Sequence, residues 1–300
     1  MRVRVLGSAA GGGFPQWNCG CGNCVDVRRG DPALSARTQD SIALSADGER
    51  WLLVNASPEI RGQIESFDAL HPRGPRHSPI AAVALTNGDL DHVLGLFSLR
   101  ESHPITVCAT SVVRDGIVAN AIYKTLERFE GQTTWRALRL GHAIDVAGLS
   151  IEAFAVAGKR PVHVEKSANA PAPSPEDNVG LVVSDGRARV AYVASAASID
   201  DAVRARIDGV DALFFDGTFW SSDELVAPGL GRARAEDMAH WPIGGRGGSL
   251  AGLAGVRAKQ KIFTHVNNTN PILRDGSDER RAVEAAGWTV AHDGLDLRLA

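Results

Sequence analysis

The residues best suited to chemistry are Asp89, Asp91 and His92, which lie close together in one loop. They follow the apolar run 81–86, which predicts a buried strand, and polar loops at strand ends are where chemistry usually sits. Two carboxylates and an imidazole can turn oxygen and nitrogen donors toward one divalent metal ion. The same residues also suit an ordinary helix start, with Asp89 as N-cap, Asp91 favouring the helix dipole and His92 on the surface. The residue types leave both interpretations open.

Two further apolar runs each end in a residue that can bind a metal. The run 212–216 ends in Asp216, and the run 261–265 ends in His265. Either residue alone would more often be a capping carboxylate or a hydrogen-bonded core histidine. Their assignment to a metal site therefore depends on whether other candidate ligands lie nearby.

Three cysteines form the other strong chemical signal. Cys19, Cys21 and Cys24 lie within six residues of a glycine-bearing loop, which predicts three of the four corners of a tetrahedral zinc site. A disulfide would leave one thiol over, and the chain shows no secretion signal, so metal is the better interpretation. Cys108 falls within the predicted strand 105–109 and is expected in the core.

Composition narrows the class of protein. The chain has 300 residues, 44% of them hydrophobic and 22% charged, enough for one large domain with a sizeable core. Its net charge of -3 and the lack of a basic stripe give no support for nucleic-acid binding. No apolar run approaches the roughly 18 residues of a membrane span, and the first residues read as a strand. We expect a soluble, cytoplasmic protein with no membrane partner.

Periodicity predicts short strands interleaved with helices. The predicted strands are Arg2–Leu6, Ser41–Ser45, Trp51–Asn55, Ala81–Thr86, Ile105–Ala109, Leu149–Ala155, Val179–Ser184, Val190–Ala194, Ala212–Asp216 and Lys261–His265. The predicted helices are Val93–Leu99, Val112–Arg128, Asp200–Ile207, Leu250–Val256 and Ser277–Ala285. The Pro- and Ala-rich stretch Ala168–Asp177 predicts a surface loop. By itself this pattern indicates only a fold that mixes α-helices and β-strands.

The loop 86–92 resembles the His-x-His-x-Asp-His signature of the metallo-β-lactamase superfamily. Asn87 and Asp89 stand at the two leading histidine positions, whereas Asp91 and His92 are retained. The resemblance implies an α/β fold, a four-layer αββα sandwich, as a single domain over residues 1–300. One metal site of the usual pair would be kept and the other altered or lost.

The same resemblance gives Asp216 the place of the metal-bridging carboxylate and His265 that of the final histidine. The superfamily's third histidine would follow the strand near residue 157, where this chain has Gly158 and Lys159, with His163 as a weak substitute. Two imidazoles and two carboxylates would then surround one ion, from the residues Asp91, His92, Asp216 and His265. Such a set suits Fe(II) that activates dioxygen, and zinc with the same ligands stays possible.

Four longer stretches are similar to the B-protein family of pyrroloquinoline quinone (PQQ) biosynthesis. These stretches are residues 5–19, 55–63, 86–92 and 264–271, and the similarity runs from near residue 5 to near residue 290. The resemblance implies iron-dependent oxygenation or hydroxylation of the tyrosine-derived ring in a peptide precursor whose Glu-Tyr pair is cross-linked. The alternative is transport, as a carrier of PQQ or its precursor toward the periplasm, and a third hypothesis is a zinc phosphodiesterase. The implied partners are the precursor, dioxygen, other proteins of the pathway and a second copy in a homodimer.

Several side chains have roles that the sequence leaves open. Related phosphodiesterases of phosphonate metabolism complete the cysteine site with a histidine at the position of Asn268, so Asn268, His240 or a water would take the fourth corner. His240 also stands where tRNA-processing relatives pair a histidine with the active-site Asp, as proton donor, dioxygen-orienting group or hydrogen-bonded support. Asp89 is either a ligand or the base for the phenolic proton, and Asn87 would hydrogen-bond the ring oxygens. The pocket wall is expected near Trp17 or Trp220.

Overall fold

The protein, seen in a computed structural model that describes residues 1–166 and 172–300, is built on two seven-stranded sheets. The first has the order β14 (Asp296–Arg298), β1 (Arg2–Gly7), β2 (Ser41–Ser45), β3 (Trp51–Val54), β4 (Ile80–Ala84), β5 (Ile105–Ala109) and β6 (Thr133–Ala137). The second has the order β13 (Trp288–Val290), β12 (Ala258–Thr264), β11 (Val210–Asp216), β10 (Arg189–Val193), β9 (Val179–Ser184), β8 (Leu149–Ala155) and β7 (Ala143–Val146).

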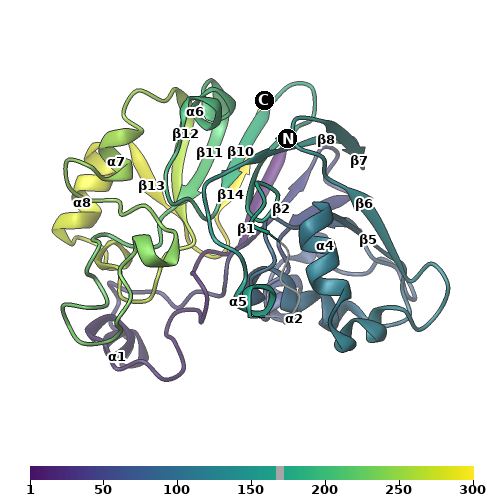
Figure 1. Cartoon of the computed structure of the whole chain (residues 1–300), viewed down its shortest axis with the longest axis horizontal. Helices are drawn as coiled ribbons and strands as arrows, with labels where there is room; N and C mark the ends of the chain where they lie inside the picture. The colour runs from purple at the N-terminus through teal and green to yellow at the C-terminus, as the bar shows by residue number, and fades with distance from the viewer. Residues whose placement is uncertain (167–171) are drawn as a thin grey trace.

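Helices lie on both sides of the paired sheets, with α6, α7 and α8 on one side and α2 and α4 on the other (Figure 1). The described helices are α1 (Gly22–Arg28), α2 (Ile60–Glu65), α3 (Leu90–Val93), α4 (Ser111–Val118), α5 (Val162–Glu165), α6 (Asp201–Ile207), α7 (Ser249–Gly252) and α8 (Asp278–Ala285). Short 3₁₀ segments lie at Asp68–Leu70, Leu94–Leu99, Ala121–Leu126, Glu236–Met238 and Pro271–Leu273. None of the helices in the described ranges is long and apolar enough to cross a membrane.

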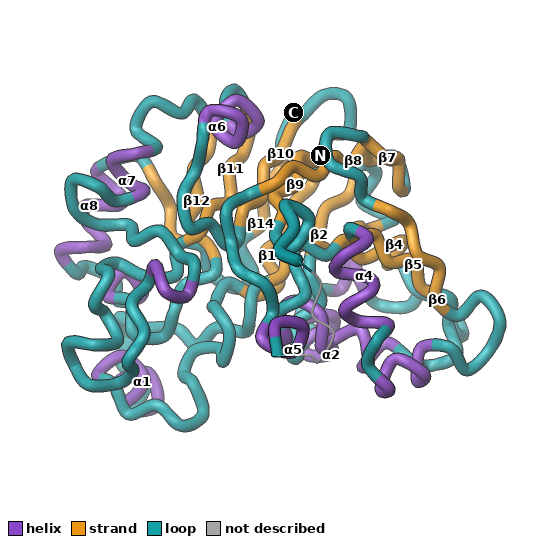
Figure 2. The backbone as a smooth tube through the Cα atoms, viewed as in Figure 1, coloured by secondary structure: helices purple, strands orange, loops and turns teal. Residues whose placement is uncertain are grey.

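Three apolar clusters hold these layers together. One lies between the sheets and joins residues such as Ile42 and Leu52 to Leu181 and Phe214. The other two fill the spaces between each sheet and its helices. The strands therefore occupy the middle of the molecule and the helices its two sides, as Figure 2 shows. This is the predicted αββα sandwich, and apolar residues on both faces of the central strands are its physical cause.

All ten predicted strands are present, with ends shifted by at most a few residues. The missed strands β6, β7, β13 and β14 lie at the sheet edges, where short and half-exposed segments carry a weak pattern. The Asp47-Gly48 and Asp185-Gly186 turns join antiparallel strands, with both glycines at positive φ.

The helix predictions were less accurate. The helix predicted over 112–128 was wrong in length, because the α-helix ends at Val118 and a 3₁₀ segment follows extended Asn120. Asparagine favours such breaks because its side chain bonds to nearby backbone. The segment 94–99 is 3₁₀ rather than α, and α7 is a single turn. Part of the loop predicted at 168–177 lies outside the described residues, and 172–177 contains no strand or helix.

Candidate metal centre and active-site cavity

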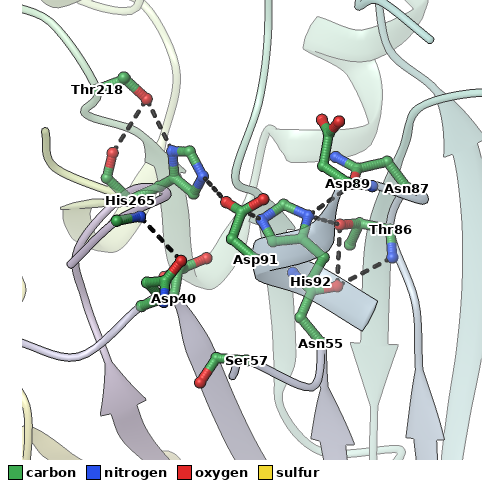
Figure 3. A network of polar contacts seen from close by, with 12 residues as sticks. Asp40, Asn55, Ser57, Thr86, Asn87, Asp89, Asp91, His92, Thr218 and His265 are labelled. Carbon is green, nitrogen blue, oxygen red and sulfur yellow. Dashed lines mark hydrogen bonds and ion pairs between the residues drawn. The ribbon is translucent and has the colours of Figure 1, made fainter. Parts of the chain in front are cut away.

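The loop after β4 brings Asp91 and His92 against His265, which follows β12 in the other sheet. The Oδ2 atom of Asp91 lies 3.2 Å from Nε2 of His265 and 3.6 Å from Nε2 of His92. Figure 3 shows the Asp91 carboxylate between the two imidazole rings. Donor atoms of the three residues all lie within 4.8 Å of one another, a spacing that one metal ion can bridge.

His92 is oriented for metal binding. Its Nδ1 lies 2.8 Å from Oδ1 of Asn87 and 3.3 Å from Oγ1 of Thr86. Because an amide oxygen only accepts, Nδ1 carries the proton and Nε2 keeps its lone pair. That buried Nε2 has no hydrogen-bond partner, and a buried nitrogen that faces a carboxylate and a second imidazole fits a metal ligand. His92 is buried, so the surface interpretation of this residue was wrong.

Thr218 orients His265. Its hydroxyl donates a hydrogen bond to Oδ1 of Asp216 at 2.6 Å. The hydroxyl oxygen of Thr218 also accepts a hydrogen bond from Nδ1 of His265 at 2.8 Å. The Nε2 atom of His265 is thereby turned toward Asp91. The ring is held in the tautomer that a metal ligand needs.

Asp216 and His240 form a second group with His265 rather than a common cage with Asp91. The Oδ2 atom of Asp216 accepts bonds from the backbone N–H of Ala196 at 2.9 Å and from Nδ1 of His240 at 2.7 Å. The four ligands implied by the superfamily resemblance are thus divided between two groups that share His265. Since the polar atoms of the second group bond one another, the group containing the orphaned His92 nitrogen fits an ion better.

The electrostatics of the first group follow from burial and proximity. Burial opposes ionisation of Asp91, but the neighbouring His92 and His265 outweigh it and hold its pKa well below its usual range. Burial also opposes a charge on His265, yet the Asp91 carboxylate raises the pKa of His265 to about 9. Burial lowers the pKa of His92. At neutral pH and without an ion, His92 is therefore neutral and His265 carries a second proton, so a metal ion that binds His265 must displace the proton on Nε2.

A cavity of about 270 Å³ opens beside these ligands. Its lining includes Asn87, Asp89, Lys159, Ser195, Phe219, Met238, His240 and Asn267. Asp89 precedes α3 at the N-cap position but makes no capping bond with its side chain, so its carboxylate is available to the cavity. Burial, followed by the charge of Asp91, raises the pKa of Asp89.

Two expectations differ from the structure, one about the aromatic wall and one about His163 as a substitute for the third histidine. Trp17 is 86% exposed, and Trp220 packs against Gly244, so the aromatic wall is Phe219 instead. His163 lies on α5 outside the cavity lining, and Lys159 stands there in place of a histidine. Asn87 lines the cavity, but its oxygen serves His92 and the backbone N–H of Asp89, and its nitrogen bonds Asn178. Its observed role is to position His92.

The three predicted zinc thiols converge on Asn268. The Nδ2 atom of Asn268 lies 3.1 Å from Sγ of Cys19, 3.7 Å from Cys21 and 3.3 Å from Cys24. Donor atoms of the cysteines lie within 4.8 Å of one another, although none of the thiols is in a disulfide. The structure therefore brings Asn268, rather than His240, to the open corner of this cluster.

The thiols differ in their readiness to ionise. Burial opposes ionisation of Cys19, but hydrogen bonds led by the Cys21 N–H lower its pKa. Burial raises the pKa of Cys21 to about 12. A cation at the centre of the cluster would favour all three thiolates, because metal ligation deprotonates thiols.

Comparison with known proteins agrees with this architecture. Residues 50–266 match a model described as a beta-lactamase superfamily domain. Over its full length the chain is 49% identical to the coenzyme PQQ synthesis protein B of Methylobacterium sp. (strain 4-46), and the match covers all of both chains. The chain belongs to the coenzyme PQQ synthesis protein B family. A member from Methylobacterium extorquens, solved as Zn(2+)-bound PqqB, is 45% identical, with a TM-score of 0.95 over all of both chains.

The fold extends beyond this family. A diphosphatase of the PhnP family is 20% identical, with a TM-score of 0.69 over 100% of this chain and 98% of its own. At that identity the likeness concerns the fold alone. The PqqB structure at 45% identity was solved with Zn(2+) bound. This chain likewise brings together groups of side chains that could hold a metal ion.

The sequence analysis missed Thr218, Phe219 and Asn267 as site residues. Thr218 and Phe219 follow Asp216 directly, and Asn267 follows His265 by two positions. Their places just after strand ends were an available signal, because such loops line the edge where the ligands meet.

Proposed function

We propose that this chain acts in PQQ synthesis as a metal-dependent enzyme that oxygenates the tyrosine-derived ring of the peptide precursor. Membership of the family supports the pathway. The observation that carries the chemistry is the group Asp91, His92 and His265, in which Nε2 of His92 has no other partner. Two histidines and one carboxylate leave coordination positions open, the arrangement of non-haem Fe(II) oxygenases.

The residues present fit such an ion. Asp91, His92 and His265 would hold it, and Fe(II) would supply open positions at which dioxygen can be activated. The Zn(2+) in the solved relative is compatible with the same donors, because the ligand types do not separate these two metals. Iron is therefore part of the proposal.

The cavity residues would handle protons and orientation. Asp89, with a side chain free of capping bonds, would accept the phenolic proton. His240, held through Nδ1 by Asp216, would be the proton donor on the opposite wall. Phe219 would contact the ring, since it lines the cavity beside His240 at a centroid distance of 5.9 Å.

The test is single-turnover oxygen uptake by protein loaded anaerobically with Fe(II), using tyrosine- and catechol-containing peptides. Replacing His265 with Ala should abolish uptake, because it removes one of two nitrogen donors, and should weaken ligand binding far less. If the protein is instead a carrier that binds a quinone through the metal, the His265→Ala variant should lose ligand binding. Wild-type protein that binds finished PQQ tightly but takes up no oxygen would overturn the proposal.

The other hypotheses have their own readouts. Hydrolysis of bis-p-nitrophenyl phosphate with zinc or manganese would favour the phosphodiesterase. Dioxygen and the precursor are the partners that the proposal requires. A homodimer, contacts with other proteins of the pathway and a cytoplasmic location stay predictions from the sequence.

A further inference from the structure

Lys159 occupies a rigidly held position at the edge of the metal cavity. The backbone before it is fixed by a bond from the N–H of Ala197 to the carbonyl of Ala157, at 2.8 Å. Gly158 packs so closely on Asn178 that an added Cβ would lie 2.5 Å from the amide nitrogen. The next residues are anchored as well, since Pro161 is buried and packs against Gly88. The Lys159 side chain therefore leaves a fixed backbone and lines the cavity.

The ammonium group of Lys159 forms no direct bond with a partner in the described ranges, although its charge acts on the Asp89 carboxylate and opposes the rise in the pKa of Asp89. No hydrogen bond or ion pair joins its ammonium group to any residue in the described ranges, whereas neighbouring Arg160 pairs with Asp177 at 3.9 Å. The cavity's own carboxylates are those of Asp89 and Asp91. A divalent ion in the site would balance these two carboxylates, so the charge of Lys159 that otherwise acts on Asp89 would be left to face the substrate.

We propose that Lys159 binds a carboxylate of the substrate, so that the site selects aromatic acids over neutral phenols. This inference rests on the proposed function for the aromatic part of the substrate. One ammonium group is a point charge suited to one carboxylate. A doubly charged phosphate would keep one negative charge that Lys159 cannot match, because Lys159 is the only basic residue among the cavity's described lining apart from the histidines. The carboxylate is therefore the anion that fits.

The experiment compares N-acetyltyrosine with N-acetyltyrosinamide, two ligands that differ in charge but share the ring. Equilibrium binding is measured on zinc-loaded protein, so no turnover is required. Wild-type protein should bind the acid about tenfold more tightly at low salt, since a charge-assisted bond is worth roughly that ratio. Lys159→Met should remove the preference and leave amide binding unchanged, and Lys159→Arg should retain it.

Lys166→Met is the matched control, because it removes the same charge outside the cavity lining and should keep the preference. Zinc content is measured on every variant to show that the metal site is intact. An unchanged preference in Lys159→Met, or equal binding of both ligands by wild-type protein, would overturn the proposal. A wild-type chain that takes up no oxygen yet prefers the acid through Lys159 would refute the oxygenase and leave this assignment standing.

Discussion

Thr218 is the residue that orients His265, one of the candidate metal ligands. One hydroxyl links Asp216 to the Nδ1 atom of His265 and lies 3.1 Å from Nδ1 of His240. Hydrogen bonds of this kind fix the tautomer and direction of a metal-binding imidazole. Thr218 is therefore a positioning residue, although it would not touch the ion.

Thr218→Val should weaken metal binding at the Asp91 site by about 10- to 100-fold, because it removes the bond that aims His265 while keeping the side chain's shape. Competitive titration with a chromophoric chelator measures this affinity. Thr289→Val, an exposed position on β13, is the control and should behave as wild type. Equal affinities in the two variants would show that the hydroxyl has no such role.

Cys21→Ser should lower zinc content and thermal stability together, since the free energy of ligand binding at a structural site is also folding free energy. Elemental analysis and calorimetry on the same sample measure both quantities. Cys108→Ser changes a buried core cysteine and should lower stability with zinc retained. Loss of zinc from Cys21→Ser at an unchanged Tm would argue against a structural metal.

At the scale of elements, the site is a product of strand ends from both sheets. Asp91 and His92 follow β4, whereas Asp216 ends β11 and His265 follows β12. β11 and β12 are parallel neighbours, and Asp216 pairs with Thr264. His265 is the next residue after Thr264 and therefore lies close to Asp216. Strand register thus decides which donors meet.

The β9–β10 turn carries a pH-dependent element. Asp185 accepts the N–H groups of Arg187 and Ala188 and lies 3.0 Å from the ammonium of Met1. Burial opposes its ionisation, but the Ala188 N–H and the Met1 ammonium outweigh burial and lower its pKa from 3.8 to about 2. Because the carboxylate has a lower pKa in the folded protein than in the unfolded chain, it stabilises the fold at pH values above the unfolded pKa of 3.8. This stabilisation is lost as the pH falls through the folded pKa of about 2.

Asp185→Asn should lower the free energy of unfolding by about 1 kcal/mol at neutral pH, because solvent screens part of the interactions that lower the pKa of Asp185 in this turn. The difference from wild type should shrink as the pH falls from about 4 toward 2. Chemical denaturation over this range measures it, with Asp145→Asn at an exposed position as control. A deficit that stays constant with pH would assign the effect to packing rather than charge.

At the scale of the whole molecule, the metal would join the two halves of the sandwich. Its candidate ligands come from the loop after β4 in one sheet and the loop after β12 in the other. An ion that binds the folded chain but not the unfolded one stabilises it by mass action.

Mn(II) or anaerobic Fe(II), which thiolate sites bind poorly compared with zinc, should raise the Tm. The gain should approach about 4 kcal/mol at a thousandfold excess over Kd. Differential scanning calorimetry with and without a chelator measures it, and His265→Ala should lose most of the gain. Anomalous scattering should place one ion beside Asp91. A second ion about 3.5 to 4 Å away beside Asp216 would contradict the single-metal prediction.

The sequence by itself determined ten of the fourteen described strands, the clustering of three cysteines and the strand-end positions of Asp91, His92, Asp216 and His265. These features are local, because apolar runs and close spacing depend on neighbours along the chain. The resemblance to a known family supplied the sandwich that periodicity could not.

Only the tertiary structure decided which of those donors face one another. It divided Asp216 from Asp91, made Thr218 the link to His265, brought Asn268 rather than His240 to the cysteines, and placed Lys159 in the cavity. These contacts join residues far apart in sequence, and they depend on sheet register and on the packing of two layers. No pattern within one segment encodes that geometry, because each segment supplies only one side of each contact.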